Sequence, residues 1–260
     1  MNIVVCVKQV PDTNEVKLDP ETGTLIRDGV PSIMNPDDKA GLEAALELKD
    51  AAGAHITVVS MGPPQADEVL REALAMGADE AILVTDRAFG GADTWATSTT
   101  IAAAVKMLDY DLIITGRQAI DGDTAQVGPQ IAEHLKIPNV SYAEDIKVQG
   151  DSVIVKRQYE DRYHTIKVQM PCLVTALGEM NKPRYMTPGG VFDAYRTSEV
   201  KVWTLENIDV DRSNIGLKGS LTHVFKSFPK ALKPTGTVVQ LDPQESADFL
   251  LKKLKEKFII

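Results

Sequence analysis

The sequence has few aromatic residues and no excess of positive charge. Phe, Trp and Tyr together make up 5% of the 260 residues, which leaves few rings for stacking the bases of a single strand. Lys and Arg total 28 against 37 for Asp and Glu, and the resulting net charge of -9 repels a phosphate backbone. We therefore expect no nucleic-acid partner.

Cysteines and long apolar segments are also scarce. Cys6 and Cys172 each lie in an apolar run and no Cys-x-x-Cys occurs, so we expect two buried, reduced thiols and no metal site. Residues 1–8 read as a strand without a secretion signal. The longest apolar stretch, 94–108, contains Lys106 and several hydroxyls, which excludes membrane insertion. These features indicate a cytoplasmic location.

Three glycine motifs of nucleotide and hydrolase sites are missing. No two glycines are spaced Gly-x-Gly, and neither Gly-Lys-Ser/Thr nor Gly-x-Ser-x-Gly occurs. These absences exclude the dinucleotide fingerprint, the P-loop and the nucleophile elbow. The four histidines are too scattered for a zinc motif, and we expect His55 and His134, at helix–strand junctions, to have structural roles.

The first half of the chain alternates short β-branched runs with helical patterns. This rhythm is typical of βαβ units and predicts an α/β fold with a parallel sheet. Asn35 before Pro36 predicts a helix N-cap, and a turn around Asp19 and Pro20 predicts an early hairpin within 16–26. We expect strands at 3–7, 56–60, 81–85 and 112–115, and helices at 36–52, 65–76 and 94–108.

After residue 135 the pattern predicts an antiparallel patch, a loop and an arm. The patch comprises a hairpin over 147–155 and a further strand at 163–168, followed by an apolar strand at 171–176 and an exposed loop at 181–190. A helix at 244–257 carries an apolar stripe. We expect an α/β nucleotide-binding domain over 1–200 and a C-terminal arm over 201–260.

The loop at 116–128 is the sharpest candidate site. It follows a buried strand and leads into a helix, so free backbone N–H groups and the helix dipole would face an anion such as phosphate. Thr124 and Gln126 add donors, while Gly122 and Gly128 would allow close approach.

Other interpretations of this loop remain open. Asp121 or Asp123 could cap the helix or accept from a ribose hydroxyl, and the loop could be a plain capping turn. A calcium loop requires a third ligand, a glycine and a glutamate where the chain has Ala125, Gln126 and Ala132.

A second loop, 86–94, also joins a strand to a helix. Its glycine pair, Gly90 and Gly91, would permit close approach to a cofactor, and Asp93 or Thr94 can cap the helix. A plain capped connection is the alternative.

Several ordered motifs together resemble one family. They lie at 7–12, 34–36, 61–63, 73–79, 116–123 and 181–185. In this order they are similar to the beta subunit of electron-transfer flavoproteins across nearly the whole chain. The resemblance implies an adenine-nucleotide-binding α/β sandwich with an antiparallel patch, and a C-terminal arm that contacts an alpha subunit.

The resemblance also implies a cofactor. Conventional members bind AMP here, whereas electron-bifurcating members bind a second FAD. The segments 9–13, 28–32 and 87–94, with the small residues Gly122 and Ala125, resemble the bifurcating group. Together with the glycine-pair loop, the resemblance places cofactor contacts at Cys6, Asn35, Pro36, Asp37, Asp38, Met61, Gly90, Gly91, Thr94, Gly116, Arg117, Gln118, Ala119, Ile120, Asp121, Gly122, Asp123, Thr124, Ala125, Gln126 and Val127.

The implied function is electron transfer in a heterodimer. NADH would reduce the FAD of this subunit, and the electrons would go to ferredoxin or flavodoxin and to a flavin-dependent dehydrogenase or reductase of the acyl-CoA or lactate type. The subunit alone would turn over no organic substrate. Residues 186–196 lack the leucine and the lysine-rich helix that anchor the usual acyl-CoA dehydrogenase. A conventional AMP-binding subunit and a non-redox nucleotide-binding module are the alternatives.

Overall fold

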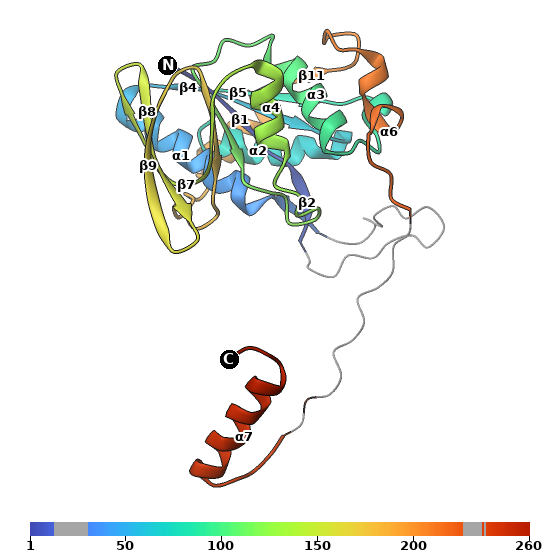
Figure 1. The fold of residues 1–260 in the computed structure, drawn as a ribbon. Coiled ribbons are helices and arrows are strands. Elements are labelled where there is room, and N and C mark those ends of the chain that lie inside the picture. The colour runs from blue at the N-terminus through green and yellow to red at the C-terminus, as the bar shows by residue number, and fades with distance from the viewer. Residues whose placement is uncertain (13–30, 226–235, 237) are drawn as a thin grey trace. The chain divides into compact units, whose positions relative to one another are not determined.

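The computed structural model describes residues 1–12, 31–225, 236 and 238–260, so the hairpin expected within 16–26 lies outside the described residues. The chain divides into two compact units, Met1–Phe225 and Lys226–Ile260. In the first unit, helices cover a large sheet (Figure 1). The mixed α/β class predicted from the sequence is confirmed.

The large sheet has nine strands in the order β11-β5-β4-β1-β6-β10-β7-β8-β9. Its pairs are parallel from β11 to β7, while β7, β8 and β9 pair antiparallel, which confirms the expected patch. The strands are β1 (Asn2–Cys6), β4 (His55–Met61), β5 (Glu80–Val84), β6 (Leu112–Gly116), β7 (Asn139–Gln149), β8 (Ser152–Tyr159), β9 (Arg162–Gln169), β10 (Cys172–Ala176) and β11 (Val200–Trp203). A second, antiparallel sheet joins β2 (Gln9–Pro11) to β3 (Ser32–Met34).

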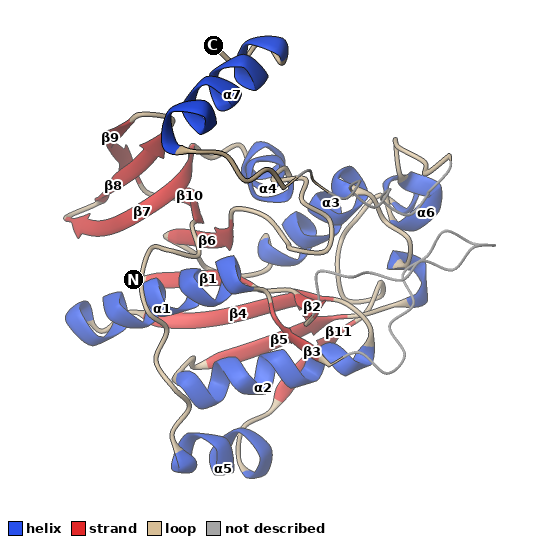
Figure 2. Cartoon of the chain, turned by 90° about the horizontal axis from the view of Figure 1, so that it is seen from below, coloured by secondary structure: helices blue, strands red, loops and turns tan. Residues whose placement is uncertain are grey.

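Helices lie on both faces of the large sheet because its central strands are apolar on both sides (Figure 2). Ile3 and Val5 of β1 belong to the core cluster that contains the buried residues of α1 and α2, and Val4 belongs to the cluster of α3 and α4. The helices of the first unit are α1 (Pro36–Ala52), α2 (Asp67–Met76), α3 (Thr94–Val105), α4 (Val127–Leu135), α5 (Pro188–Arg196) and α6 (Gly216–Gly219). Helix α1 has the predicted bounds, and the other helices and strands predicted within the described residues differ only at their ends.

Two predicted boundaries are wrong. The first unit continues beyond residue 200, because β11 pairs with β5 and Ile208 and Ile215 enter the core. Strand β11 has only four residues, two of them exposed, so its pattern is weak. The expected loop over 181–190 ends at Thr187, whose Oγ1 accepts from Gly190 N at 3.0 Å and caps α5.

The expected cysteines and histidines occupy structural positions. Cys6 and Cys172 are buried and free. His134 lies near the end of α4, where Nε2 is 3.2 Å from Ser98 Oγ and the ring packs against Trp95. His55 begins β4, with Nδ1 3.7 Å from Asp79 Oδ2.

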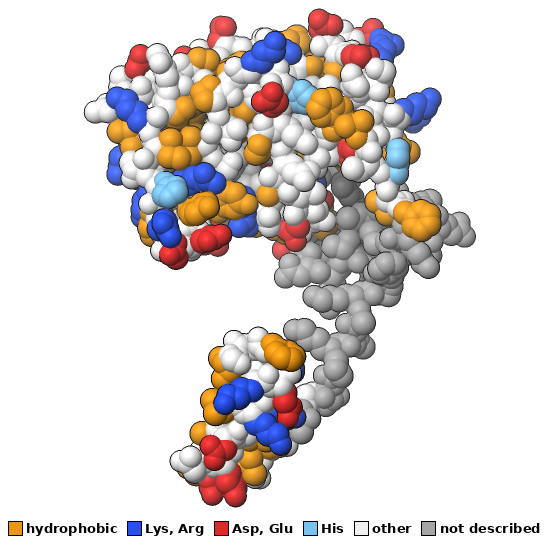
Figure 3. Space-filling model, viewed as in Figure 1, with side chains coloured by type: hydrophobic (Ala, Val, Ile, Leu, Met, Phe, Trp, Pro, Cys, Tyr) orange, Lys and Arg blue, Asp and Glu red, His pale blue; other side chains and the backbone are white. Residues whose placement is uncertain are grey.

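The second unit contains helix α7 (Pro243–Glu256), close to the predicted range. Asp242 caps the helix by accepting from Glu245 N at 2.8 Å. Leu250, Leu251 and Leu254 are exposed along it, and apolar side chains gather between charged ones in Figure 3. Among the described residues, no helix has the length and hydropathy required to cross a membrane.

Candidate functional site

The candidate site lies where the order of strands reverses. After β1 the chain adds β4 and β5 on one side and then β6 on the other, so the carboxyl ends of β1 and β6 are neighbours, with Cys6 opposite Thr115. Ligands of open α/β sheets bind at this kind of switch point. Three predicted contacts, Cys6, Met61 and Gly116, end β1, β4 and β6. Burial raises the pKa of the Cys6 thiol to about 12, so it remains protonated.

The buried carboxylate of Asp38 fixes the start of the loop 116–128. Its Oδ1 accepts from Gly116 N at 2.9 Å and its Oδ2 accepts from Lys8 N at 2.8 Å. Burial raises the pKa of Asp38 to about 7, and the hydrogen bonds to the carboxylate oppose this shift. A Cβ at Gly116 would lie 2.2 Å from Asp38 Oδ1, so only glycine fits.

Asn35 holds the next part of the loop. Its Nδ2 donates to Gln118 O at 2.8 Å, and its Oδ1 accepts from Ile120 N at 3.1 Å. Asn35 is the N-cap of α1 as predicted and the helix begins at Pro36, but the Asn35 side chain makes no capping hydrogen bond. The side-chain amide of Asn35 is hydrogen-bonded to a segment more than 80 residues away. A local sequence pattern cannot reveal such a partner.

The two aspartates of the loop do not cap α4. Both carboxylate oxygens of Asp121 accept from Lys8 Nζ, at 2.7 and 2.9 Å. Asp123 Oδ1 accepts from Gln118 Nε2 at 2.8 Å. The N-cap is Gln126, whose side chain makes no capping hydrogen bond. Of the interpretations left open for Asp121 and Asp123, capping of this helix is excluded.

The end of the loop has the geometry of an anion cradle. Asp123 and Ala125 have φ of 50° and 52°, and Gln126 returns to the right-handed region. Successive amides in such alternating conformations turn their N–H groups to one side, and the uncapped end of α4 adds further N–H groups. Thr124 is exposed, and a Cβ at Gly122 would meet no atom within 4 Å. This donor set fits a phosphate.

Gly128 lies where α4 packs against the sheet. A Cβ there would lie 2.6 Å from Thr115 Oγ1 and 2.8 Å from Thr175 Cγ2. The residue therefore allows α4 to pack closely on β6 and β10.

The N-terminus of α3 adjoins the cradle. Thr94 Oγ1 donates to Gln126 Oε1 at 3.0 Å, while Asp93 caps α3 by accepting from Ala96 N at 2.9 Å. The glycine pair contacts the chain itself: Gly90 O accepts from Leu217 N at 3.0 Å, and a Cβ at Gly91 would lie 3.1 Å from Leu217 Cβ. This loop thus packs against α6.

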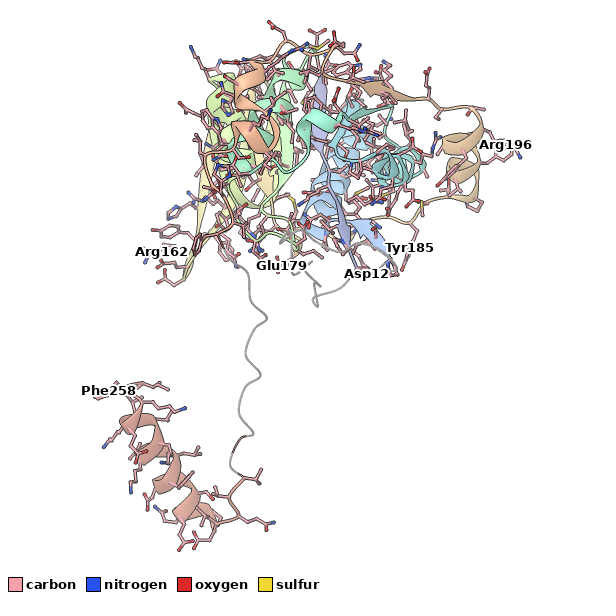
Figure 4. All side chains as sticks on the ribbon, turned by 90° about the vertical axis from the view of Figure 1, so that its right-hand side faces the viewer. Asp12, Arg162, Glu179, Tyr185, Arg196 and Phe258 are labelled. Atoms are coloured by element: carbon pink, nitrogen blue, oxygen red, sulfur yellow. The ribbon has the colours of Figure 1, made fainter. Side chains whose placement is uncertain are left out.

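Arg117 leaves the loop toward β7. Its Nε is 3.3 Å from Asp37 Oδ2, and its guanidinium carbon is 6.0 Å from the centre of the Tyr142 ring. Burial raises the pKa of Asp37, and Arg117 partly offsets this effect. Figure 4 shows Glu179, which follows β10, and Asp12, which follows β2, along one edge of the first unit.

Sequence reasoning missed the roles of two residues in this region. Lys8 lies two residues after the last residue of β1 and pairs with the loop, and a cation just beyond a buried strand was the available signal. Tyr142 has φ of 63° at a bulge in β7, and its N–H donates to Thr175 Oγ1 at 3.0 Å. No local pattern marks a left-handed tyrosine. Within the described ranges, no cluster of His, Cys, Asp and Glu could hold a metal ion.

Comparison with known proteins identifies the family to which the chain belongs. The electron transfer flavoprotein domain matches residues 22–207. The chain is 60% identical to an electron transfer flavoprotein subunit beta of Clostridium acetobutylicum over 260 residues. It is 57% identical to the caffeyl-CoA reductase-Etf complex subunit CarD of Acetobacterium woodii and 48% identical to the acryloyl-CoA reductase electron transfer subunit gamma of Anaerotignum propionicum. Each of the three matches spans 100% of both chains. The domain match covers most of the chain and the relatives align from end to end, so the chain belongs to the electron transfer flavoprotein family, among its beta subunits.

Proposed function

We propose that this electron-transfer subunit binds FAD at the carboxyl edge of its sheet and receives electrons from NADH for bifurcation. The observation that carries the proposal is the anion cradle formed by the left-handed residues Asp123 and Ala125 and the uncapped N-terminus of α4. Its position at the switch point between β1 and β6 is where an open α/β sheet binds a nucleotide.

The residues divide into those that hold the loop and those that hold the ligand. Asn35 and Asp38 fix the loop through three hydrogen bonds to its backbone, at residues 116, 118 and 120. The α4 amides, with Thr124 and Gln126, donate to a phosphate. Open space beside Gly122 leaves a path for the second phosphate of a dinucleotide. FAD, when bound, accepts a hydride and passes electrons on singly.

The proposed assembly includes an alpha subunit and two electron acceptors. The names of relatives, which include subunits of acyl-CoA reductase systems, support a flavin-dependent dehydrogenase or reductase as one acceptor. Ferredoxin or flavodoxin is the other, and the cytoplasm is the compartment. The exposed stripe of α7 would contact the alpha subunit. Tyr185, Met186 and Phe192, exposed before and within α5, would contact the flavoenzyme.

The closest competing function is conventional electron transfer with AMP in the same cradle. Both ligands place a phosphate at α4, so the cradle alone does not separate them. The open space at Gly122 favours the larger dinucleotide. In a non-redox module the nucleotide would only stabilise the fold.

The test removes side-chain donors from the cradle. Thr124→Val with Gln126→Leu should lower the nucleotide retained after gel filtration of the purified complex, because each lost charge-assisted hydrogen bond contributes about 1.5–3 kcal/mol. Thr165→Val with Gln169→Leu makes the same replacements on exposed positions of β9 and should change nothing. Equal nucleotide content in the two variants would refute the assignment of the cradle.

A further inference from the structure

An anion-binding loop that contains two aspartates requires a charge to offset them. Asp121 is three residues before Thr124, so the two Cα atoms lie within about 11 Å of one another. An uncompensated carboxylate at this range would repel a phosphate, since the separation is close to the screening length of about 10 Å at 0.1 M salt. Among the residues that the structure describes, Asp121 is paired with the ammonium group of Lys8, whereas Asp123 accepts from the neutral amide of Gln118.

Lys8 supplies that charge in a fixed geometry. Its Nζ lies 2.7 and 2.9 Å from the two carboxylate oxygens of Asp121, whose side chain is only 6% exposed. A buried carboxylate without this partner would lose both its counter-charge and two hydrogen bonds. The ion pair therefore offsets the negative charge of Asp121. The N–H groups of the cradle then dominate the local electrostatic field.

The backbone of Lys8 is tied to the same loop. Lys8 N and Gly116 N both donate to the carboxylate of Asp38, so one side chain of α1 sets the end of β1 and the start of the loop. The ion pair then sets the middle of the loop, 113 residues away in sequence. Just beyond it, Asp123 and Ala125 hold left-handed conformations that persist only where the surroundings fix them.

We propose that Lys8 is the positioning residue of the anion cradle, and that its ion pair with Asp121 makes an aspartate-containing loop able to bind the phosphate of a nucleotide. The proposal rests on the proposed function, because it assumes that the cradle holds a nucleotide. It assigns Lys8 no direct contact with the ligand. Its effect on binding passes through the charge and position of Asp121.

An ordinary surface ion pair would behave differently, and the chain offers one for comparison. Lys49 Nζ lies 2.6 Å from Asp79 Oδ1, on side chains that are 31% and 29% exposed, and also donates to Gly77 O at 2.9 Å. It joins α1 to the segment before β5, away from the loop 116–128. Lys49→Met should lower thermal stability and leave nucleotide retention unchanged.

The experiment is a charge-rescue cycle on the purified complex. Nucleotide content per complex and its rate of release into excess AMP would be measured for the parent, Lys8→Met, Asp121→Asn and the double variant. We expect Lys8→Met to release nucleotide about tenfold faster, and Asp121→Asn in the same chain to restore most of the loss, because both charges are then absent. Asp121→Asn alone should retain nucleotide at least as well as the parent, and added salt should slow release from Lys8→Met.

The outcomes separate this inference from the proposed function. If Lys8→Met releases nucleotide at the same rate as the parent, the proposed role of Lys8 is overturned. It is also overturned if the double variant releases nucleotide as fast as Lys8→Met, since Lys8 would then act independently of Asp121. If Lys8→Met does not fold, weaker retention by Asp121→Asn than by the parent overturns the proposal, and equal or tighter retention supports it. A parent complex that carries no nucleotide on this subunit contradicts the proposed function itself.

Discussion

Gly116→Ala should destabilise the protein strongly, because the loop begins in a space with no room for a methyl group. The new Cβ would lie 2.2 Å from Asp38 Oδ1, 2.8 Å from Asp38 N and 2.9 Å from Asp37 Cβ. Two of these atoms belong to backbone or lie next to it in the first turn of α1, so they cannot rotate away. Either α1 or the loop must move, and the 2.9 Å hydrogen bond from Gly116 N to Asp38 is lost.

The magnitude follows from these two losses. Overpacking a filled site costs about 1–3 kcal/mol, and losing a hydrogen bond to a charged group costs roughly another 1.5–3 kcal/mol. The sum is about 2.5–6 kcal/mol, which lowers the unfolding midpoint of a chain of this size by roughly 5–24 °C. Calorimetry or circular dichroism of the purified complex, with nucleotide content measured in parallel, reports both effects.

Gly122→Ala is the matched control within the same loop. A Cβ there meets no atom within 4 Å, and the residue is not in the left-handed region. We expect its unfolding free energy to remain within about 0.5 kcal/mol of the parent. A Gly116→Ala variant as stable as Gly122→Ala would refute the packing of the loop against α1.

Four further predictions concern other parts of the chain. Tyr142→Gly should be more stable than Tyr142→Ala by about 1 kcal/mol in denaturant titrations, because glycine adopts the φ of 63° without cost; equal stability would contradict this backbone conformation. Burial raises the pKa of Asp38 from 3.8 to about 7, so the stability that its protonated form contributes is complete below pH 4 and is lost as the pH rises through 7. The stability of Asp38→Asn relative to the parent should therefore improve between pH 4 and pH 8, and a constant difference would argue against the shift. Truncation after Leu241 removes α7 and should abolish co-purification with the alpha subunit, whereas undiminished association would exclude the helix from that interface. Met186→Glu with Phe192→Ala, at exposed positions, should reduce electron delivery to the flavoenzyme while NADH-driven reduction of an artificial dye persists. Equal loss of both activities would contradict a docking role for these residues.

The sequence predicts those parts of the fold whose signals are local. The strands β1, β4, β5 and β6 are continuous apolar runs, and Asn35 followed by Pro36 marks the start of α1. Strand β11 could not be predicted with equal ease, because it is short, lies at the edge of the sheet and has exposed residues at its centre.

The site was predictable as a place but not as a set of contacts. The loop 116–128 follows a buried strand and precedes a helix, which suffices to indicate an anion site. The partners of its side chains are distant in sequence: Asn35 meets Gln118 across 83 residues and Lys8 meets Asp121 across 113. The same distance explains why the side chains of Asn35 and Asp121 make no capping hydrogen bonds, since each is already bonded to a remote segment.

The composition of the purified complex tests the central claim most directly. The complex of this chain with its alpha subunit would be denatured, and the released FAD and AMP would be counted by chromatography against protein concentration. We expect two FAD per heterodimer and no AMP, because the cradle at α4 would hold the phosphates of the second flavin. One FAD with one AMP would contradict the bifurcating assignment, and a complex without flavin would contradict every redox role proposed for this chain.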